Sequence, residues 1–336
     1  MPLNPPAKYD GIHTARVIQS TGSWYDIQGD DGIIHAARLP GKFRQTHSGQ
    51  TNPIAVGDYV HYTINEDKSA QITNILERTN YVTRKATHGR RGQQILVSNI
   101  DYAILVSSIK QPSYKTGFID RFLVSCEAYQ VTPILFFNKM DLADDADLNE
   151  LAHTSTLYED LGYHVLHGSI LAPKSIDELK TFIKDKTSVF LGPSGVGKTS
   201  LLNAIDVRLD ERTAEISSYS NKGKHTTTFA KLVPLPFGGF LADTPGIREF
   251  GLYNIEDWEI SLYFPEMLLP RESCKFNTCT HIHEPSCGVL EAVDRGQIAP
   301  SRYLSYMNVI ESSRIYEVLT RQNFYSVFSF TILVSV

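Results

Sequence analysis

Residues 192–200 of this chain read Gly192-Pro193-Ser194-Gly195-Val196-Gly197-Lys198-Thr199-Ser200, and they directly follow the strand-like residues 188–191. This is the pattern of a phosphate-binding loop, in which a glycine-rich segment ending in Lys-Thr connects a strand to a helix. The glycines allow backbone N–H groups to converge on phosphate oxygens. We expect Lys198 to reach the β- and γ-phosphates, Thr199 to coordinate Mg²⁺, and the helix N-terminus to favour the phosphate charge. The stretch therefore predicts a nucleotide-binding α/β domain.

Strand-like and helix-like segments alternate on the N-terminal side of this loop. We expect strands at residues 102–106, 133–137, 163–166 and 188–191, and helices at residues 118–129, 148–161 and 176–184. Such alternation is typical of a parallel sheet covered by helices on both faces. Ligands of these sheets bind at the carboxyl ends of the strands, so the loops that follow the strands form the candidate site.

The tetrapeptide Asn138-Lys139-Met140-Asp141 stands directly after the predicted strand 133–137, where a base-binding loop belongs. The Asp141 carboxylate can accept hydrogen bonds from guanine N1–H and from the exocyclic amine, whereas adenine has an acceptor at N1 and no amine at that edge. Such polar mismatches discriminate steeply, on the order of 10⁴-fold. Asn138 would brace the phosphate loop or the base, and the Lys139 stem can lie over the purine plane. We therefore expect a guanine nucleotide.

Two further segments supply candidate ligands for Mg²⁺. Residues 239–243 end in Asp243, which suits Mg²⁺ through water, and the N–H of Gly246 can sense the γ-phosphate. Residues 222–228 are polar and offer threonine hydroxyls to Mg²⁺ in a segment that could act as a switch. The alternative is a plain strand entry, because residues 226–233 have the composition of a strand.

The group that activates water is less evident from the sequence. After Gly246 the chain reads Ile247-Arg248-Glu249, and an apolar side chain cannot orient the attacking water. His225 is the nearest candidate, because an imidazole can position water or accept its proton. The alternative is an exposed His225 without a chemical role. In either case we expect slow hydrolysis until a partner orders the switch segment.

The N-terminal part has short β-prone runs between turn residues. We expect strands at residues 14–18, 23–27, 33–38, 58–64 and 70–76, which suggest a small barrel of the OB type. Such barrels commonly bind oligonucleotides, and the alternative is a barrel used only for packing. Residues 1–92 hold 11 Lys+Arg against 8 Asp+Glu, although the whole chain has a net charge of -5. Residues 84–92 read as an exposed basic linker, so a polyanion should meet this part first.

Three of the four cysteines, Cys274, Cys279 and Cys287, lie within fourteen residues, together with His281 and His283. Three thiolates and one imidazole suit a tetrahedral, closed and therefore structural Zn²⁺ site in a reducing compartment. The alternative is a set of buried free thiols. Spacing alone leaves either histidine as the fourth ligand. We expect helices at residues 258–267 and 303–318 on the two sides of this loop.

The order of these motifs is permuted, because the tetrapeptide 138–141 precedes the phosphate loop, whereas small GTPases have the opposite order. With the barrel in front and the Cys/His cluster behind, residues 12–318 resemble the RsgA (YjeQ) family of GTPases that depend on the small ribosomal subunit. The resemblance implies that Thr227 is the Mg²⁺ ligand of the switch and that His281 is the zinc ligand. It also implies a second guanine-contacting loop, which residues 167–170 match only at Ser169, since Ile170 departs from the pattern.

We therefore expect an α/β P-loop GTPase domain, circularly permuted, behind an OB-like β-barrel and in front of a zinc-binding helical domain. The expected bounds are 1–82 for the barrel, 83–250 for the GTPase domain, 251–320 for the zinc domain and 321–336 for an apolar tail. The expected reaction is Mg²⁺-dependent hydrolysis of GTP to GDP, stimulated by the small ribosomal subunit during its late maturation and with rRNA contact. The alternatives are a P-loop ATPase or kinase, and a non-catalytic RNA-binding scaffold with a vestigial nucleotide site.

The expected roles follow from these motifs. Lys198, Thr227 and His225 are the catalytic candidates; Thr199, Thr227 and Asp243 are the candidate Mg²⁺ ligands. The N-terminus shows no secretory signal and the clustered cysteines suggest a reducing compartment, so we expect a cytoplasmic protein. We also expect a monomer without membrane contact. Residues 322–336 carry no charge and many apolar side chains, but fifteen residues fall short of the roughly 20 that span a bilayer. A docked strand, or a disordered or aberrant terminus, is the expected reading of this tail.

Overall fold

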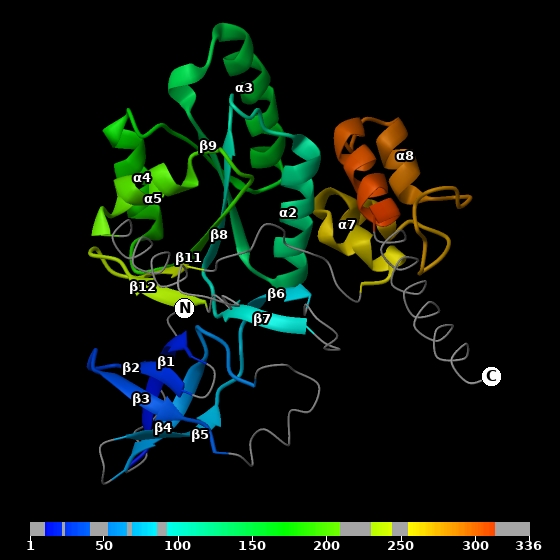
Figure 1. Cartoon of the computed structure of the whole chain (residues 1–336). Helices are drawn as coiled ribbons and strands as arrows, with labels where there is room; N and C mark the ends of the chain where they lie inside the picture. The colour runs from blue at the N-terminus through cyan, green and yellow to red at the C-terminus, as the bar shows by residue number, and fades with distance from the viewer. Residues whose placement is uncertain are drawn as a thin grey trace, which may run out of the picture. The chain divides into compact units, whose positions relative to one another are not determined.

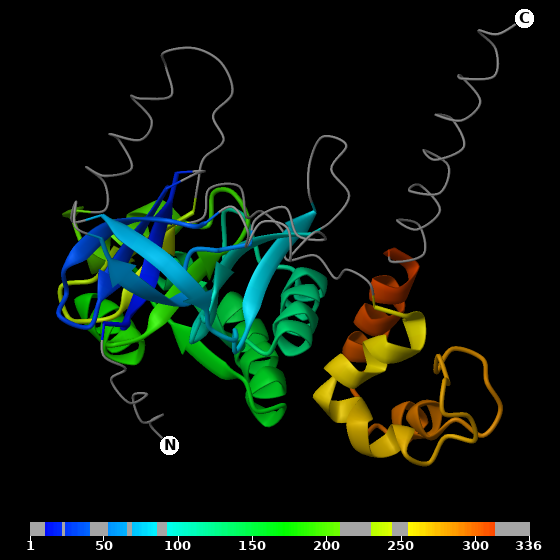
Figure 2. The same cartoon turned by 90° about the horizontal axis from the view of Figure 1, so that it is seen from below.

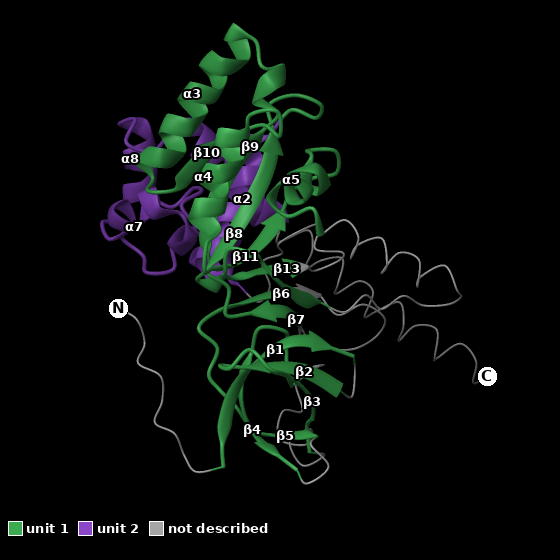
Figure 3. Cartoon of the chain, turned by 90° about the vertical axis from the view of Figure 1, so that its left-hand side faces the viewer, with its two compact units in different colours: residues 1–113, 129–251 green, residues 114–128, 252–336 purple. Residues whose placement is uncertain are grey.

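The computed structural model describes residues 11–21, 24–40, 53–65, 69–85, 93–208, 230–243 and 255–312. The chain forms two compact units, coloured separately in Figure 3. The first contains residues 1–113 and 129–251, and the second contains residues 114–128 and 252–336. Residues 114–128 thus group with the C-terminal part of the chain, although they lie in the sequence between two strands of the first unit.

Five strands close into a barrel in the N-terminal part of the first unit (Figure 1). They are β1 (His13–Ser20), β2 (Trp24–Gly29), β3 (Ile34–Arg38), β4 (Tyr59–Ile64) and β5 (Ala70–Ile75). Neighbouring strands are antiparallel, except that β3 and β5 are parallel, and the pairing of β1 with β4 closes the barrel. Alternate side chains such as Val17, Ile27 and Ile72 are buried in its core. The predicted five-stranded barrel is confirmed.

The second part of the first unit is a mainly parallel sheet of the order β10-β9-β8-β11-β13-β12. Its strands are β8 (Tyr102–Ser108), β9 (Thr132–Asn138), β10 (His164–His167), β11 (Thr187–Leu191), β12 (Lys231–Pro234) and β13 (Phe240–Asp243). All pairs are parallel except β12 with β13. The strands β8, β9 and β11 are almost continuously buried, as their unbroken apolar runs predict.

Helices α3 (Asp145–Asp160), α4 (Pro173–Ile183) and α5 (Lys198–Ile205) complete this part. Side chains of α4 and α5, such as Leu179 and Leu201, share one buried apolar cluster with Ile104 of β8 and Phe136 of β9. Helix α3 begins at a capping box, in which the Asp144 carboxylate accepts from Asp147 N and the Asp147 carboxylate accepts from Asp144 N. The predicted alternation of strands and helices is present over residues 102–191.

The stretch interpreted as a basic linker is partly a hairpin. Strand β6 (Tyr81–Lys85) pairs antiparallel with β7 (Gln93–Ser98), so Arg84 and Lys85 lie at the end of a strand. Val82 and Val97 are fully buried, and this burial of β-branched side chains accounts for the strand pairing. The charges dominated the sequence pattern and obscured the alternation beneath it. Residues 86–92 lie outside the described residues.

The barrel and the sheet share one bridging arginine in the first unit. Arg16 of β1 donates to Thr187 Oγ1 of β11 at 2.7 Å and to Asn99 O at 2.8 Å. Its guanidinium lies 5.2 Å from the ring centroid of Tyr59 and 5.3 Å from that of Phe240. Beside it, Gln19 of β1 pairs with Lys231 of β12, so the barrel continues the sheet.

The second unit is helical. It contains α2 (Thr116–Tyr129), the 3₁₀ helix η2 (Asp257–Tyr263), α7 (Pro265–Arg271), α8 (Gly288–Asp294) and a final helix at residues 300–312. The last residue of α2, Tyr129, is counted with the first unit. The single helix predicted at residues 258–267 is wrong, because the chain is extended at Phe264, with φ -116° and ψ 101°. Pro265 imposes this break, since a proline disfavours helical geometry in the residue before it. Of the helix predicted at residues 303–318, the part beyond residue 312 lies outside the described residues.

Buried side chains from all these helices form the core of the second unit. Val124 of α2 packs in one cluster with Phe264, Met267, Val289 and Tyr306. The loop of residues 274–287 is orange in Figure 2, beside the yellow and red helices of the same unit. Within the described ranges, the structure contains no helix with the length and apolar character needed to cross a bilayer. The apolar tail 321–336 lies outside those ranges.

Candidate nucleotide and metal sites

The glycine-rich loop connects the end of β11 to the start of α5 at Lys198. Two of its glycines are required by close packing. Gly192 has φ 139°, and a Cβ there would lie 2.1 Å from Val106 O. Gly197 has φ 92°, and a Cβ there would lie 2.6 Å from Asn138 Nδ2. Both positions therefore exclude a side chain for backbone and steric reasons.

Lys198 lies folded against its own loop. Its Nζ donates to Gly192 O at 2.7 Å and to Pro193 O at 2.6 Å. Burial lowers the pKa of the Lys198 ammonium from its ordinary value. Thr199 and Ser200, in the first turn of α5, are exposed. The first turn of α5 thus presents one desolvated cation and two accessible hydroxyl groups.

Asn138 joins the base loop to the phosphate loop. It is the last residue of β9, is 3% exposed, and donates from Nδ2 to Val196 O at 2.9 Å. Its Oδ1 is buried and has no hydrogen-bond partner in the part of the chain that the structure describes. The adjacent Lys139 has φ 62° and donates from Nζ to Gly195 O at 2.7 Å. Two consecutive side chains therefore hold the carbonyl groups of the phosphate loop.

Asp141 contacts the loop that follows β10. It lies in the short 3₁₀ helix η1 (Met140–Leu142), and its Oδ1 accepts a hydrogen bond from Ser169 Oγ. Ser169 is 3% exposed and also accepts from Leu171 N at 3.1 Å, whereas the Asp141 residue is exposed. Met140 N donates to Gly168 O at 3.2 Å. The two predicted guanine-contacting loops are therefore neighbours, and one carboxylate is accessible beside them.

The structure assembles only part of the predicted site. The phosphate loop, residues 138–141 and Ser169 lie together at the carboxyl ends of β11, β9 and β10. Asp243 is the last residue of β13 and pairs with Lys231, but nothing is described of its side chain. His225, Thr227 and Gly246 lie outside the described residues. The expected Mg²⁺ ligand set and water-activating group therefore stay predictions.

Sequence reasoning missed the loop between β8 and α2. Gln111 O accepts a hydrogen bond from Lys139 Nζ, and Ile109 N donates to Asn138 O at 3.2 Å. Lys110 Nζ lies 2.7 Å from Asp144 Oδ2 and 2.5 Å from Asp147 Oδ2, at the start of α3. These contacts attach the loop to the base-binding segment. No sequence motif marks the contacts of Ile109 and Gln111, because both residues take part through backbone atoms.

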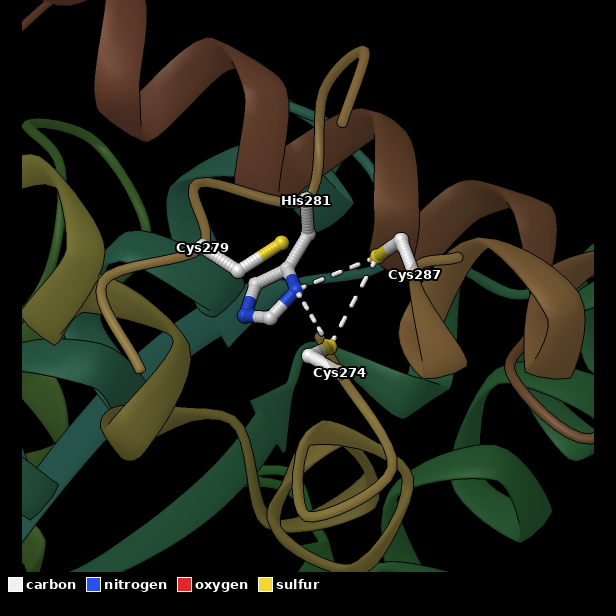
Figure 4. A group of neighbouring side chains, drawn as sticks. All are labelled: Cys274, Cys279, His281 and Cys287. Atoms are coloured by element: carbon white, nitrogen blue, oxygen red, sulfur yellow. Dashed lines mark hydrogen bonds between the residues drawn. The ribbon is translucent and has the colours of Figure 1, made fainter. Parts of the chain in front are cut away.

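The Cys/His cluster converges in the second unit (Figure 4). The ligand atoms of Cys274, Cys279, His281 and Cys287 all lie within 4.8 Å of one another. His281 Nδ1 lies 3.5 Å from Cys274 Sγ and 3.3 Å from Cys287 Sγ, and the two sulfur atoms are 3.8 Å apart. His283 is exposed and is not part of this group. The geometry thus favours His281 over His283 as the fourth metal ligand.

The donor set suits a zinc ion. Three sulfur atoms and one imidazole nitrogen in a largely buried cluster match the number and the kind of ligands that hold structural Zn²⁺. Burial raises the pKa of the Cys279 and Cys287 thiols. Burial and the nearby Arg271 lower the pKa of His281 to about 4. Without metal, Cys279 and Cys287 are therefore thiols and His281 is a neutral imidazole, and metal binding would release the two thiol protons.

Comparison with protein families identifies matches over most of the chain. The family model described as RsgA GTPase matches residues 75–253, and the model described as RsgA N-terminal domain matches residues 14–72. The small ribosomal subunit biogenesis GTPase RsgA of Bacteroides fragilis is 42% identical over 295 residues, which cover 88% of this chain and 95% of the relative. The RsgA protein of Flavobacterium psychrophilum is 43% identical over 301 residues, covering 89% and 92%.

Two solved structures have the same architecture. YjeQ from Thermotoga maritima superposes with a TM-score of 0.73 at 35% identity, covering 90% of this chain and 98% of that protein. YloQ, described as a circularly permuted GTPase, gives a TM-score of 0.72 at 31% identity, covering 91% and 96%. The permuted order of the nucleotide motifs and the N-terminal barrel are therefore features that this chain shares with solved proteins.

Proposed function

This chain belongs to the RsgA GTPase family, and from that premise we propose that it hydrolyses GTP in the course of small ribosomal subunit biogenesis. The predicted family resemblance and fold class are confirmed. The observation that carries the proposal is the pair of bonds from Asn138 and Lys139 to the phosphate loop, with the Asp141 carboxylate accessible beside them. One connected site thus presents a phosphate cradle and a reader for guanine.

In this proposal the residues of the phosphate loop bind the β- and γ-phosphates of GTP. Lys198 exchanges the carbonyl groups of Gly192 and Pro193 for phosphate oxygens, because an anion is a stronger partner for a desolvated ammonium. Gly192 and Gly197 keep the loop close to β8 and Asn138. Asp141 accepts from guanine N1–H and from the exocyclic amine, while Ser169 holds the carboxylate in place.

Thr199, Thr227 and Asp243 are the proposed holders of Mg²⁺. When bound, the ion neutralises charge on the transferring phosphoryl group. His225 is the proposed water-positioning residue. Thr227 and His225 belong to one segment of the sequence, and we propose that contact with the small subunit orders this segment for hydrolysis. The unstimulated reaction is therefore slow.

We further propose that Cys274, Cys279, His281 and Cys287 hold one structural zinc ion in the second unit. Four protein ligands leave no open coordination position, so the ion stabilises the fold and takes no part in hydrolysis. The barrel is the proposed rRNA-binding part, because small barrels of this type bind oligonucleotides on one face. The small subunit, GTP and GDP are the proposed partners.

Nucleotide competition tests the base specificity on which this function depends. A fluorescent GDP analogue is bound to the full-length protein and displaced with GTP, GDP or ATP. We expect GTP and GDP to displace the probe and ATP to fail at concentrations at least a hundredfold higher, because Asp141 mismatches adenine. Displacement by ATP at the same concentration as GTP would favour the alternative, a P-loop ATPase or kinase.

A further inference from the structure

The backbone around His281 adopts an unusual conformation. His281 has φ 53°, in the left-handed region that residues other than glycine seldom occupy. Such a conformation persists only where surrounding contacts impose it. In this conformation His281 directs Nδ1 toward Cys274 Sγ and Cys287 Sγ. The contacts that impose the backbone geometry therefore determine whether the metal ligands converge.

One carboxylate holds the N–H groups on both sides of His281. Glu284 Oε1 accepts from Thr280 N at 2.7 Å and from Thr280 Oγ1 at 2.6 Å. Its Oε2 accepts from Ile282 N at 3.0 Å and from His283 N at 3.1 Å. Both oxygens are thereby engaged, and Glu284 is not a member of the ligand group.

Two tyrosines of the final helix hold the carbonyl side of the same segment. Tyr303 donates from its hydroxyl to His281 O at 2.8 Å, and Tyr306 donates to Thr280 O at 2.7 Å. Tyr306 is fully buried, and its ring centroid lies 6.2 Å from that of His281. The segment is thus held through its N–H groups by Glu284 and through its carbonyl groups by the helix 300–312.

We propose that Glu284 is a positioning residue of the metal centre, which builds the ligand geometry of His281 before the metal binds. Tyr303 and Tyr306 support it from the other side of the loop. The inference rests on the proposed zinc site and adds to it a residue that does not touch the ion. The metal meets a preformed loop, so little of its binding energy is spent on ordering the backbone. Residues that orient ligands in this way typically change metal affinity by about 10- to 100-fold.

The test uses Glu284→Gln in the full-length protein. The amide places N–H donors opposite backbone N–H donors and removes acceptor capacity, while the shape of the side chain is preserved. Zinc affinity is measured by competition with a chromophoric chelator, and ligand geometry by the visible absorption of bound Co²⁺. We expect a loss of zinc affinity of about 10- to 100-fold and a changed Co²⁺ spectrum. Glu291→Gln is the matched control, because Glu291 is exposed and its carboxylate pairs with Arg295 on the same helix.

A second variant separates positioning from general loss of folding. Tyr303→Phe retains the ring and removes only the donor to His281 O, so we expect a smaller loss of zinc affinity and a spectral change in the same direction. Glu284→Gln with the zinc affinity and Co²⁺ spectrum of Glu291→Gln would overturn the inference. Absence of bound zinc and Co²⁺ in the wild-type protein would overturn the proposed zinc site itself, and the role of Glu284 would fall with it.

Discussion

Asp141 is the residue on which nucleotide choice depends. Its exposed carboxylate is held at one oxygen by Ser169 Oγ, and it lies on the loop that Asn138 ties to the phosphate loop. Replacing Asp141 by Asn exchanges one acceptor for a donor, which mismatches the exocyclic amine of guanine and matches the oxygen of xanthine at that place. We expect Asp141→Asn to shift preference from GTP toward XTP, measured by competition for the bound nucleotide. Unchanged GTP affinity in this variant would exclude Asp141 as the base reader.

Gly197 sets the distance between the phosphate loop and the base loop. A Cβ at this position would lie 2.6 Å from Asn138 Nδ2. The backbone φ of 92° is also one that residues with a side chain rarely adopt. We expect Gly197→Ala to weaken GTP binding at least tenfold, measured by titration, because the loop or Asn138 must move. Gly117→Ala is the control, since a Cβ at Gly117 meets no atom within 4 Å. Equal GTP affinity for both variants would show that this close approach is not required for binding.

At the residue scale, the sequence motifs predicted where the two loops lie better than they predicted the hydrogen bonds between them. The spacing of 138–141 and 192–199 placed both loops at strand ends, because the carboxyl ends of parallel strands meet at one edge of a sheet. The sequence left open whether Asn138 braces the phosphate loop or the base, and the bond to Val196 O gives it the first role in this structure. The carbonyl of Gln111 and the carboxylate of Glu284 escaped prediction, because neither belongs to a chemical motif of its own.

At the scale of elements, a buried ion network ties α2 to the C-terminal helices of the second unit. Arg302 donates from Nη1 to Asp120 Oδ1 at 2.5 Å and from Nε to Glu266 Oε1 at 2.6 Å. Arg302 and Asp120 are each 1% exposed. Since they are 182 residues apart in sequence, alternation of strands and helices could not reveal that α2 packs with the C-terminal helices.

This network predicts a large effect of one substitution on stability. Arg302→Met removes the cation and leaves Asp120 in a buried environment, which typically costs about 3–5 kcal/mol. The free energy of unfolding, measured by denaturant titration, should fall by this amount. Arg295→Met, at an exposed i,i+4 pair with Glu291, should change it by less than about 0.5 kcal/mol. A loss for Arg302→Met as small as that for Arg295→Met would contradict a stabilising network.

The arginine that bridges the barrel and the sheet gives a second prediction at this scale. Arg16→Met removes the charge-assisted bonds to Thr187 Oγ1 and Asn99 O, each worth about 1.5–3 kcal/mol. We expect the midpoint of denaturant unfolding of the first unit to fall. Arg38→Met is the control. Like Arg16, Arg38 places its guanidinium over an aromatic ring, 3.7 Å from the Trp24 ring centroid, but Arg38 is exposed. A shift no larger than in the control would argue against a structural role for the bridge.

At the scale of the whole molecule, the motifs in their order along the sequence predicted a barrel, a nucleotide site and a metal cluster in one chain. The order of strands and motifs predicted the permuted architecture, since each strand end could be matched to a loop. The hairpin β6–β7 was not predicted, because the basic residues of β6 hid its short apolar pattern. The break at Phe264 was not predicted, because a single proline ends one short helix and begins the next. Longer buried strands such as β8 and β9 left no such ambiguity.

The most direct test of a ribosome-dependent GTPase is the rate of GTP hydrolysis by the full-length protein with and without purified small ribosomal subunits. We predict slow release of phosphate by the protein alone and a clear acceleration by small subunits, because the proposed function assigns completion of the hydrolytic site to contact with that partner. Lys198→Ala should abolish both rates, and raised salt should weaken the acceleration more than nucleotide binding, since RNA contacts release counterions. A rate that stays the same at saturating small subunits, in protein that binds GTP normally, would contradict the proposed function.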